Sequence, residues 1–231
     1  MILSNPVRYI EQNPTGAVIH AAKGRYICKR VIVSIPTPLY KDIIFDPPLP
    51  KDKMSLSQQN KLGFINKICV RYSSPWWRKA GLTGMIQSFT GPISVTRDIS
   101  VEQKDHFALT CFCAGDAGRE LSKLSQQQRF KVVTDQIKAT LGVAAGIDVP
   151  EPIAIDEHEW AHDLWSQGCP CPAAPPGVMS QFEDSLRSSH GKVHFVGTET
   201  AYEWKGYLDG AIRAGKRGAK EVVLALNAAK L

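Results

Sequence analysis

The chain has 231 residues, of which 43% are hydrophobic and 22% are charged, and its formal net charge is +6. This is the composition of an ordinary globular protein. No run approaches the roughly 18 consecutive apolar residues that a membrane-spanning helix needs. The opening residues, MILSNPVRYIEQNP, show no basic segment followed by an apolar one, so we expect no secretory signal.

The basic residues are scattered except for one group near the C-terminus. This group consists of Arg213, Lys216, Arg217 and Lys220, which fall along one face of a predicted helix. We interpret the stripe as a solvated helix surface and expect no nucleic-acid partner.

Six cysteines without a signal peptide indicate a reducing compartment and free thiols. Cys111 and Cys113 alternate in a strand-like run, so we expect both to face the same side and to pack. Cys169 and Cys171 lie in a loop. The C-x-C spacing of both pairs is unlike the usual zinc-binding spacings, and we expect no metal site.

In the first quarter of the chain the apolar pattern alternates and is interrupted by Asn, Pro and Gly. We expect strands at 7–12, 17–22 and 25–35, a turn at 13–16, a short helix at 39–43 and a helix at 51–60.

The middle of the chain mixes strand and helix signals. Strands are predicted at 64–72, 83–88, 92–97, 106–114 and 152–157, and helices at 119–124, 125–141 and 177–187. Ser125 with Gln128 three residues later predicts a capped helix start. A loop is expected at 160–176. Because strands and helices do not alternate regularly, the pattern favours an α+β fold.

The most informative stretch is HFVGTETAYEWKGYLDGA at 194–211. It predicts a short strand, a break at Gly197, a polar turn, and a helix that runs from about 207 to 227. A helix start offers free N–H groups and a positive dipole end to an electron-rich ligand. Gly206 and Gly210 permit the close approach of a flat ligand or of another backbone. The alternative is an ordinary glycine-containing connection between strand and helix.

The apolar residues of this helix recur at helical spacing and predict a single buried face. They are Leu208, Ala211, Ile212, Gly215, Ala219, Val222, Val223 and Leu226.

GTETA at 197–201, WKGYLDGA at 204–211 and GKRGA at 215–219 together resemble the C-terminal FAD-contacting segment of flavin-containing amine oxidases, the monoamine oxidase family. The resemblance implies FAD as the cofactor. It also implies that Tyr207 presents its ring to an amine substrate. The implied FAD contacts in this stretch are Gly197, Thr198, Glu199, Tyr207 and Leu208.

Further segments are similar to the same family. The strand that begins at Val7 resembles the one that holds the FAD adenine through backbone groups. Lys67 matches the lysine that holds a water near flavin N5, and Phe112 matches a position that lines the substrate cavity. Trp160 and Cys169 match a loop that carries a flavin-facing tryptophan and, in animal enzymes, the cysteine linked covalently to FAD.

Each of these assignments has a plainer alternative. Lys67 could be a solvent-facing strand lysine, Trp160 a core residue and Cys169 an unlinked thiol. Glu199 could cap a turn, and Tyr207 could be an ordinary buried aromatic.

One departure from the family concerns the substrate. The family often has an aromatic residue directly after the loop cysteine, where this chain has Pro170. In the family, this aromatic residue and the tyrosine at the position of Tyr207 form a two-sided cage for the amine. The resemblance therefore assigns only one side of the cage in this chain, Tyr207.

The similarity covers the family's C-terminal half. No G-x-G-x-x-G occurs in the sequence. We therefore expect an α+β chain that holds a mixed-sheet substrate domain with helices, plus the C-terminal strand and helix of an FAD-binding, dinucleotide-type domain whose N-terminal part is absent. The predicted segments are 1–35 (domain junction), 36–155 (substrate domain) and 156–231 (FAD-contacting segment).

By this resemblance the function is FAD-dependent oxidative deamination of primary or secondary amines to an imine or aldehyde, with O2 reduced to H2O2. The implied partners are a small amine and O2. The alternatives are a catalytically inactive fragment or noncatalytic interaction module and, within the family, a polyamine or L-amino-acid oxidase.

The last residues, Ala229-Lys230-Leu231, keep the small-basic-Leu pattern of a peroxisomal targeting signal. An enzyme that makes hydrogen peroxide suits that compartment. We expect the peroxisomal matrix, with a peroxisomal import receptor as a partner, and otherwise the cytoplasm.

Overall fold

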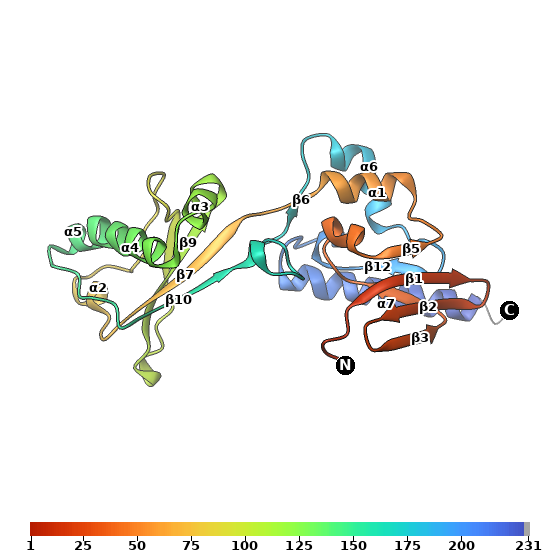
Figure 1. Ribbon diagram of the computed structural model, residues 1–231, viewed down its shortest axis with the longest axis horizontal. Helices are drawn as coiled ribbons and strands as arrows, with labels where there is room; N and C mark the ends of the chain where they lie inside the picture. Colours follow the sequence, from red (N-terminus) through yellow and green to blue (C-terminus); the bar gives the residue numbers. More distant parts are fainter. Residues whose placement is uncertain (229–231) are drawn as a thin grey trace. The chain divides into compact units, whose positions relative to one another are not determined.

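A computed structural model describes residues 1–228 of the chain (Figure 1). Strands and helices follow one another in mixed order, which confirms the α+β class. The chain divides into two compact units, which we call the first unit (Met1–Leu62 with Cys171–Leu231) and the second unit (Gly63–Pro170). The predicted boundary after residue 35 falls inside the first unit. The functional division into three segments stays a prediction.

The first unit contains a four-stranded sheet of order β3-β2-β1-β5. Its strands are β1 (Val7–Asn13), β2 (Gly16–Ala21), β3 (Gly24–Cys28) and β5 (Ile44–Asp46). The turn at 13–16 is confirmed, because Asn13 Oδ1 accepts hydrogen bonds from the backbone N–H groups of Thr15 and Gly16.

The single strand predicted at 25–35 is wrong. The chain forms β3 and then β4 (Val31–Val33), and β4 pairs in parallel with β12 (Val193–Phe195) in a separate sheet. The backbone changes partner at this point, since the N–H of Val31 donates to Lys192 O at 3.0 Å. Lys29 and Arg30 interrupt the apolar run between β3 and β4, where the strand partner changes.

The helices of the first unit pack around these strands. They are η1 (Thr37–Asp42), α1 (Lys51–Gln59), α6 (Val178–Arg187), η5 (Thr198–Thr200) and α7 (Leu208–Ala228), with a short β6 (Lys61–Leu62) and β11 (Pro172–Ala173) pair. Helices α1 and α6 lie side by side (Figure 1), with Leu56 packed against Phe182 and Leu186. Tyr40, Phe45 and Phe195 form the aromatic part of the main core.

The buried face predicted for α7 is wrong. The buried residues are Gly210, Ala214 and Gly218, whereas Ile212 and Val223 are exposed. The cause is the close approach of the chain after β12: a Cβ added at Gly218 would lie 2.3 Å from Val196 Cγ1. Only small residues fit on that side, so the large apolar ones face outward.

The interpretation of the basic stripe on α7 is wrong for Arg217. Arg213 is half exposed and pairs with Asp209 and Glu203. The Arg217 side chain is only 19% exposed and donates to Phe195 O at 2.8 Å. Arg217 is therefore part of the packing between α7 and β12.

The second unit is built on an antiparallel sheet of order β10-β7-β9-β8. Its strands are β7 (Ile65–Tyr72), β8 (Val95–Asp98), β9 (Phe107–Ala114) and β10 (Ala154–Glu159). The strand predicted at 83–88 is wrong, and only Gln87 forms an isolated bridge there. Thr96 Oγ1 accepts from Ile86 N and donates to Gly84 O, so a side chain satisfies backbone groups that a regular strand would pair with another strand.

The helical elements of the second unit are α2 (Trp76–Lys79), η2 (Glu102–Lys104), α3 (Gly115–Ser122), α4 (Gln126–Ile137), η3 (Lys138–Gly142), α5 (Val143–Ala145) and η4 (Trp160–His162). The capping box of Ser125 with Gln128 is confirmed. In this unit α3 and α4 lie along β7 and β9 (Figure 1). Among residues 1–228, no helix combines the length and apolarity needed to cross a membrane.

The sheet of the second unit has two different faces. On β7 the side chains of Asn66, Ile68 and Val70 are buried, and Lys67 between them is exposed. Cys111 and Cys113 of β9 are both buried in the same core, which confirms that they pack. All six cysteines are free thiols. Because side chains alternate along the strand, Lys67 lies on the other face of the sheet, which we call the open face.

Candidate functional site

Two of the predicted site residues meet on the open face of the second unit. Lys67 of β7 is paired with Phe112 of β9, and Lys67 Nζ lies 5.0 Å from the centre of the Phe112 ring. Lys67 is exposed and Phe112 is half buried. The exposed charge is compatible with both the site interpretation and the solvent-facing alternative. The aromatic contact gives the ammonium group a defined position.

The same row continues on β10 with His158, which sequence reasoning missed. His158 is paired with Lys67, and its ring centre lies 4.2 Å from that of Trp160 in an edge-on arrangement. Trp160 is 36% exposed, so it is not a core residue. Extending the predicted strand at 152–157 by one residue would have included His158, since paired residues on neighbouring strands share a face.

Cys169 is held against the start of β7. Its backbone N–H donates to Gly63 O at 3.1 Å, and its Sγ donates to Ile65 O at 3.4 Å. A Cβ at Gly63 would lie 2.5 Å from Cys169 O, so glycine is required for this approach. Burial raises the pKa of the Cys169 thiol, against smaller lowering effects from Ile65 and Lys67. The thiol is therefore protonated at neutral pH.

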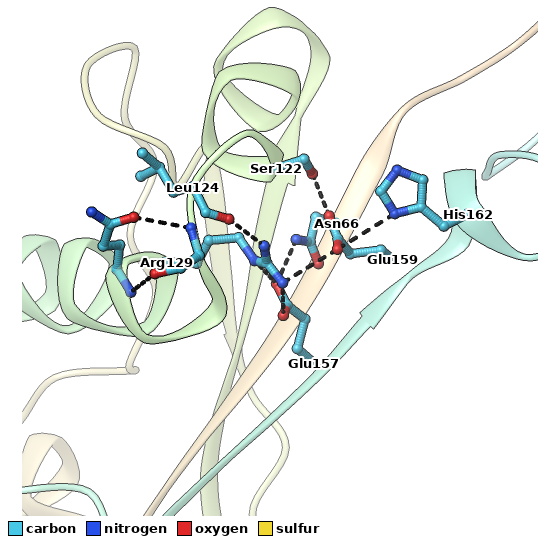
Figure 2. Close-up of polar contacts among 9 residues, drawn as sticks. Asn66, Ser122, Leu124, Arg129, Glu157, Glu159 and His162 are labelled. Carbon is cyan, nitrogen blue, oxygen red and sulfur yellow. Dashed lines mark hydrogen bonds and ion pairs between the residues drawn. The ribbon is translucent and has the colours of Figure 1, made fainter.

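A polar network occupies the opposite face of β10 and β7 (Figure 2). Arg129 of α4 donates from Nε and Nη2 to the two carboxylate oxygens of Glu157, at 2.7 and 2.6 Å. Arg129 Nη1 also donates to Leu124 O, and Asn66 Nδ2 donates to Glu157 Oε1. Burial raises the pKa of Glu157, but these hydrogen bonds together lower it below its usual value. The network fixes β10 against α4.

The network extends to the turn that carries Trp160. Glu159 accepts a hydrogen bond from Ser122 Oγ at 2.5 Å, and its carboxylate lies 3.3 Å from Arg129 and 3.5 Å from His162 (Figure 2). Glu157 and Glu159 face the helices, and His158 between them faces the open side. Glu157 and Glu159 therefore anchor β10 to the helices, and His158 between them lies on the open face.

The first unit gathers a second set of predicted residues around Thr198. Thr198 Oγ1 accepts from Gly206 N at 2.7 Å and donates to Tyr207 O at 2.9 Å. Gly197 and Gly206 have φ of +111° and +87°, values that favour glycine. The turn at 197–200 is thus tied to the residues directly before α7.

The start of α7 is exposed. Tyr207 is 66% and Leu208 87% exposed, so Tyr207 is not an ordinary buried aromatic. The Trp204 ring lies 5.9 Å from that of Tyr207. The first N–H groups of a helix have no partner within it and carry the positive end of its dipole. A Cβ at Gly210 would lie 2.1 Å from Trp204 O, so this glycine serves a close backbone approach.

Glu199 and Val7 complete the predicted set in the first unit. Glu199 is 4% exposed, and burial raises its pKa to about 7. A carboxylic acid that stays protonated near neutral pH can donate a hydrogen bond. Val7 is half buried at the edge of the core that contains Phe195.

Comparison with known proteins identifies the family. The sequence profile of flavin containing amine oxidoreductases matches residues 1–223. The chain belongs to this family. Its members use FAD as their cofactor.

The curated relatives include amine oxidases of mammals. The chain is 34% identical to amine oxidase [flavin-containing] B of Cavia porcellus. The alignment spans 227 residues, which are 97% of this chain and 43% of that protein. Amine oxidase [flavin-containing] A of Equus caballus is 32% identical, with 97% and 42% covered. The chain therefore spans less than half the length of these relatives.

Solved structures show the same fold. Wild-type putrescine oxidase bound to putrescine superimposes with a TM-score of 0.89 at 28% identity, over 96% of this chain and 49% of that one. Cyclohexylamine oxidase from Brevibacterium oxydans IH-35A gives a TM-score of 0.87 at 26% identity, over 96% and 48%. Amine oxidation is the activity that these relatives share.

Proposed function

We propose that this chain takes part in FAD-dependent oxidative deamination of primary or secondary amines, with O2 reduced to H2O2. Family membership over residues 1–223 carries the proposal. The FAD-contacting residues that the resemblance assigns between 197 and 208 also lie together around Thr198 and the start of α7.

The chemistry of the first unit suits a flavin. The free N–H groups at the start of α7 can stabilise negative charge on an electron-rich ring. Tyr207 offers an exposed aromatic face, and buried Glu199 offers a protonated carboxyl group near neutral pH. When bound, FAD would supply the acceptor for two electrons from the amine and the centre at which O2 is reduced.

In the second unit, the family resemblance assigns Lys67, Phe112 and Trp160. Lys67 would hold a water molecule through its ammonium group, and its charge disfavours a protonated amine nearby. The substrate would therefore react as the neutral amine. Phe112 and Trp160 would provide apolar contact surface for the substrate and cofactor. Pro170 supplies no ring where the family often has one, so Tyr207 would be the principal aromatic contact for the amine.

Diamine or polyamine oxidation is the second candidate within the family, since a putrescine oxidase has the same fold. L-amino-acid oxidation is the third oxidase candidate. The candidate function that is not enzymatic is a noncatalytic interaction module. The exposed apolar residues Ile212 and Val223 on α7 favour it.

The proposed compartment is the peroxisomal matrix, reached through an import receptor. Ala229-Lys230-Leu231 lies outside the described residues. Fusing the last residues of the chain to a fluorescent protein tests the signal: peroxisomal foci are expected, and a diffuse signal would reject the proposal.

The function is tested by purifying the 231-residue chain with added FAD and measuring peroxide release from a panel of amines. Benzylamine, putrescine and an L-amino acid distinguish the three oxidase candidates. Peroxide release that requires both FAD and an amine supports the proposal. A chain that binds FAD but releases no peroxide with any of them favours the noncatalytic candidate.

A further inference from the structure

Arg217 reaches from α7 to two other parts of the first unit. Its Nη2 donates to Phe195 O at the end of β12, at 2.8 Å, and to Thr200 Oγ1 at 2.9 Å. Its Nη1 donates to Glu221 on the same helix. One guanidinium group thus joins a strand end, the turn after it and the helix that follows.

A second arginine contacts the same turn from α6. Arg187 Nε donates to Thr200 O at 3.0 Å, and Nη2 donates to Ala201 O at 3.5 Å. The guanidinium lies 4.0 Å from the centre of the Tyr202 ring. The Arg187 side chain is 15% exposed, so these contacts are largely shielded from water.

Thr200 is the residue on which both arginines converge. Its carbonyl accepts from Arg187, and its hydroxyl accepts from Arg217 and donates to Gly197 O at 2.9 Å. The Thr200 N–H also donates to Gly197 O, at 3.0 Å. The backbone of Gly197, Thr198 and Glu199 therefore forms a turn that the two hydrogen bonds from Thr200 to Gly197 O close.

A planar guanidinium can donate several hydrogen bonds in fixed directions, which a lysine ammonium cannot reproduce. Hydrogen bonds with a charged donor are also stronger than neutral ones, and more so when shielded from water. The two arginines thus hold the turn from two helices.

We propose that Arg187 and Arg217 are positioning residues that act through Thr200 to fix the turn at 197–200. On the proposed function, this turn contacts FAD, so the two arginines would set the geometry of that contact without touching the cofactor.

The test compares Arg217→Met and Arg187→Met with a matched control, Arg213→Met. Arg213 lies one turn earlier on α7 but pairs only with the exposed Asp209 and Glu203. Arg217→Lys tests whether charge alone suffices. Thr200→Val removes only the hydroxyl and keeps the experiment informative if an arginine variant fails to fold.

The first readout is amide hydrogen exchange of peptides that cover residues 196–207, measured without FAD. We expect Arg217→Met and Thr200→Val to accelerate exchange about tenfold, with a smaller gain for Arg217→Lys and none for Arg213→Met. Equal exchange in Arg217→Met and Arg213→Met would overturn the proposal.

The second readout is the dissociation constant for FAD, which should rise about tenfold in Arg217→Met. If the unmodified chain binds no FAD, the proposed function fails, and the exchange measurement still decides whether the arginines fix the turn. Faster exchange with unchanged FAD affinity would contradict the link between turn and cofactor.

Discussion

Lys67 of β7 and His158 of β10 are direct partners in the antiparallel pairing of these strands. Phe112 is the partner of Lys67 on the other side, in β9. Lys67 is thus flanked by an imidazole and a phenyl ring in one row on the open face of the sheet. This row holds two residues that the family resemblance assigns and one that it does not.

Replacing Lys67 by Met tests its proposed role. The variant should keep FAD and still accept electrons from an amine, while reoxidation by O2 slows on the order of a hundredfold, because a positive group that stabilises developing charge is lost. Stopped-flow absorbance measures both half-reactions. Lys79→Met, an exposed lysine on α2 in the same unit, is the control. Unchanged reoxidation in Lys67→Met would contradict the role.

The Arg129–Glu157 pair should make the second unit sensitive to acid. The lowered pKa of Glu157 means that its contribution to stability is present above its usual value of 4.5 and is lost as the pH falls through the lower, folded-state value. Replacing Arg129 by Met leaves a buried carboxylate unpaired and should cost about 3 kcal/mol at pH 7.

Urea unfolding at pH 7 and at acidic pH measures this cost. The control is Lys131→Met, which removes an exposed pair with Asp135 on the same helix and should change stability by less than about 1 kcal/mol. If the two variants are equally stable, the network in Figure 2 does not anchor β10.

Glu199 should produce the opposite pH dependence. In the unfolded chain it loses its proton near 4.5, whereas in the folded chain it keeps the proton to about 7. Stability attributable to this group therefore falls as the pH rises through that window, and the cost is complete above pH 7. Glu199→Gln should be more stable than the unmodified chain by about 3 kcal/mol at pH 8.

Thermal unfolding of the cofactor-free chain at pH 4 and pH 8 tests this prediction. No difference is expected at pH 4, where the folded and unfolded groups are both protonated. A variant that is less stable at pH 8 would show that ionised Glu199 has a favourable partner in the fold.

The glycines of α7 separate into two kinds. Gly210→Ala would place a Cβ 2.1 Å from Trp204 O, a backbone atom, and should destabilise the fold by about 1–3 kcal/mol. Gly215 has no atom within 4 Å of an added Cβ, so Gly215→Ala should stabilise the helix by up to about 1 kcal/mol. Urea denaturation compares them, and two changes of the same sign would contradict the packing of α7.

The sequence predicts those features that depend on local chemistry. The capping box at Ser125 and the strand predicted at 64–72 follow from neighbouring residues, and both are confirmed. The neighbour against which a segment pairs or packs in the fold does not follow from its local sequence. The run at 25–35 changes sheets at Val31, and the apolar face of α7 points outward because Val196 approaches Gly218. Both depend on residues distant in sequence.

The same limit applies to the site. Tyr207 and Cys169 could be proposed because they belong to patterns that resemble a family. His158 and Arg217 acquire meaning only through strand pairing and through contacts with Lys67, Phe195 and Thr200. An arginine in a basic helical stripe has no sequence feature that distinguishes a packed side chain from a solvated one.

The most direct test of the proposed activity is the visible spectrum of the purified chain with FAD, recorded without oxygen before and after adding an amine. We predict that the absorbance of bound flavin bleaches on adding benzylamine or putrescine and returns when O2 is admitted, with one H2O2 formed per flavin reoxidised. A chain that binds no FAD, or bound flavin that no amine bleaches, would contradict the account.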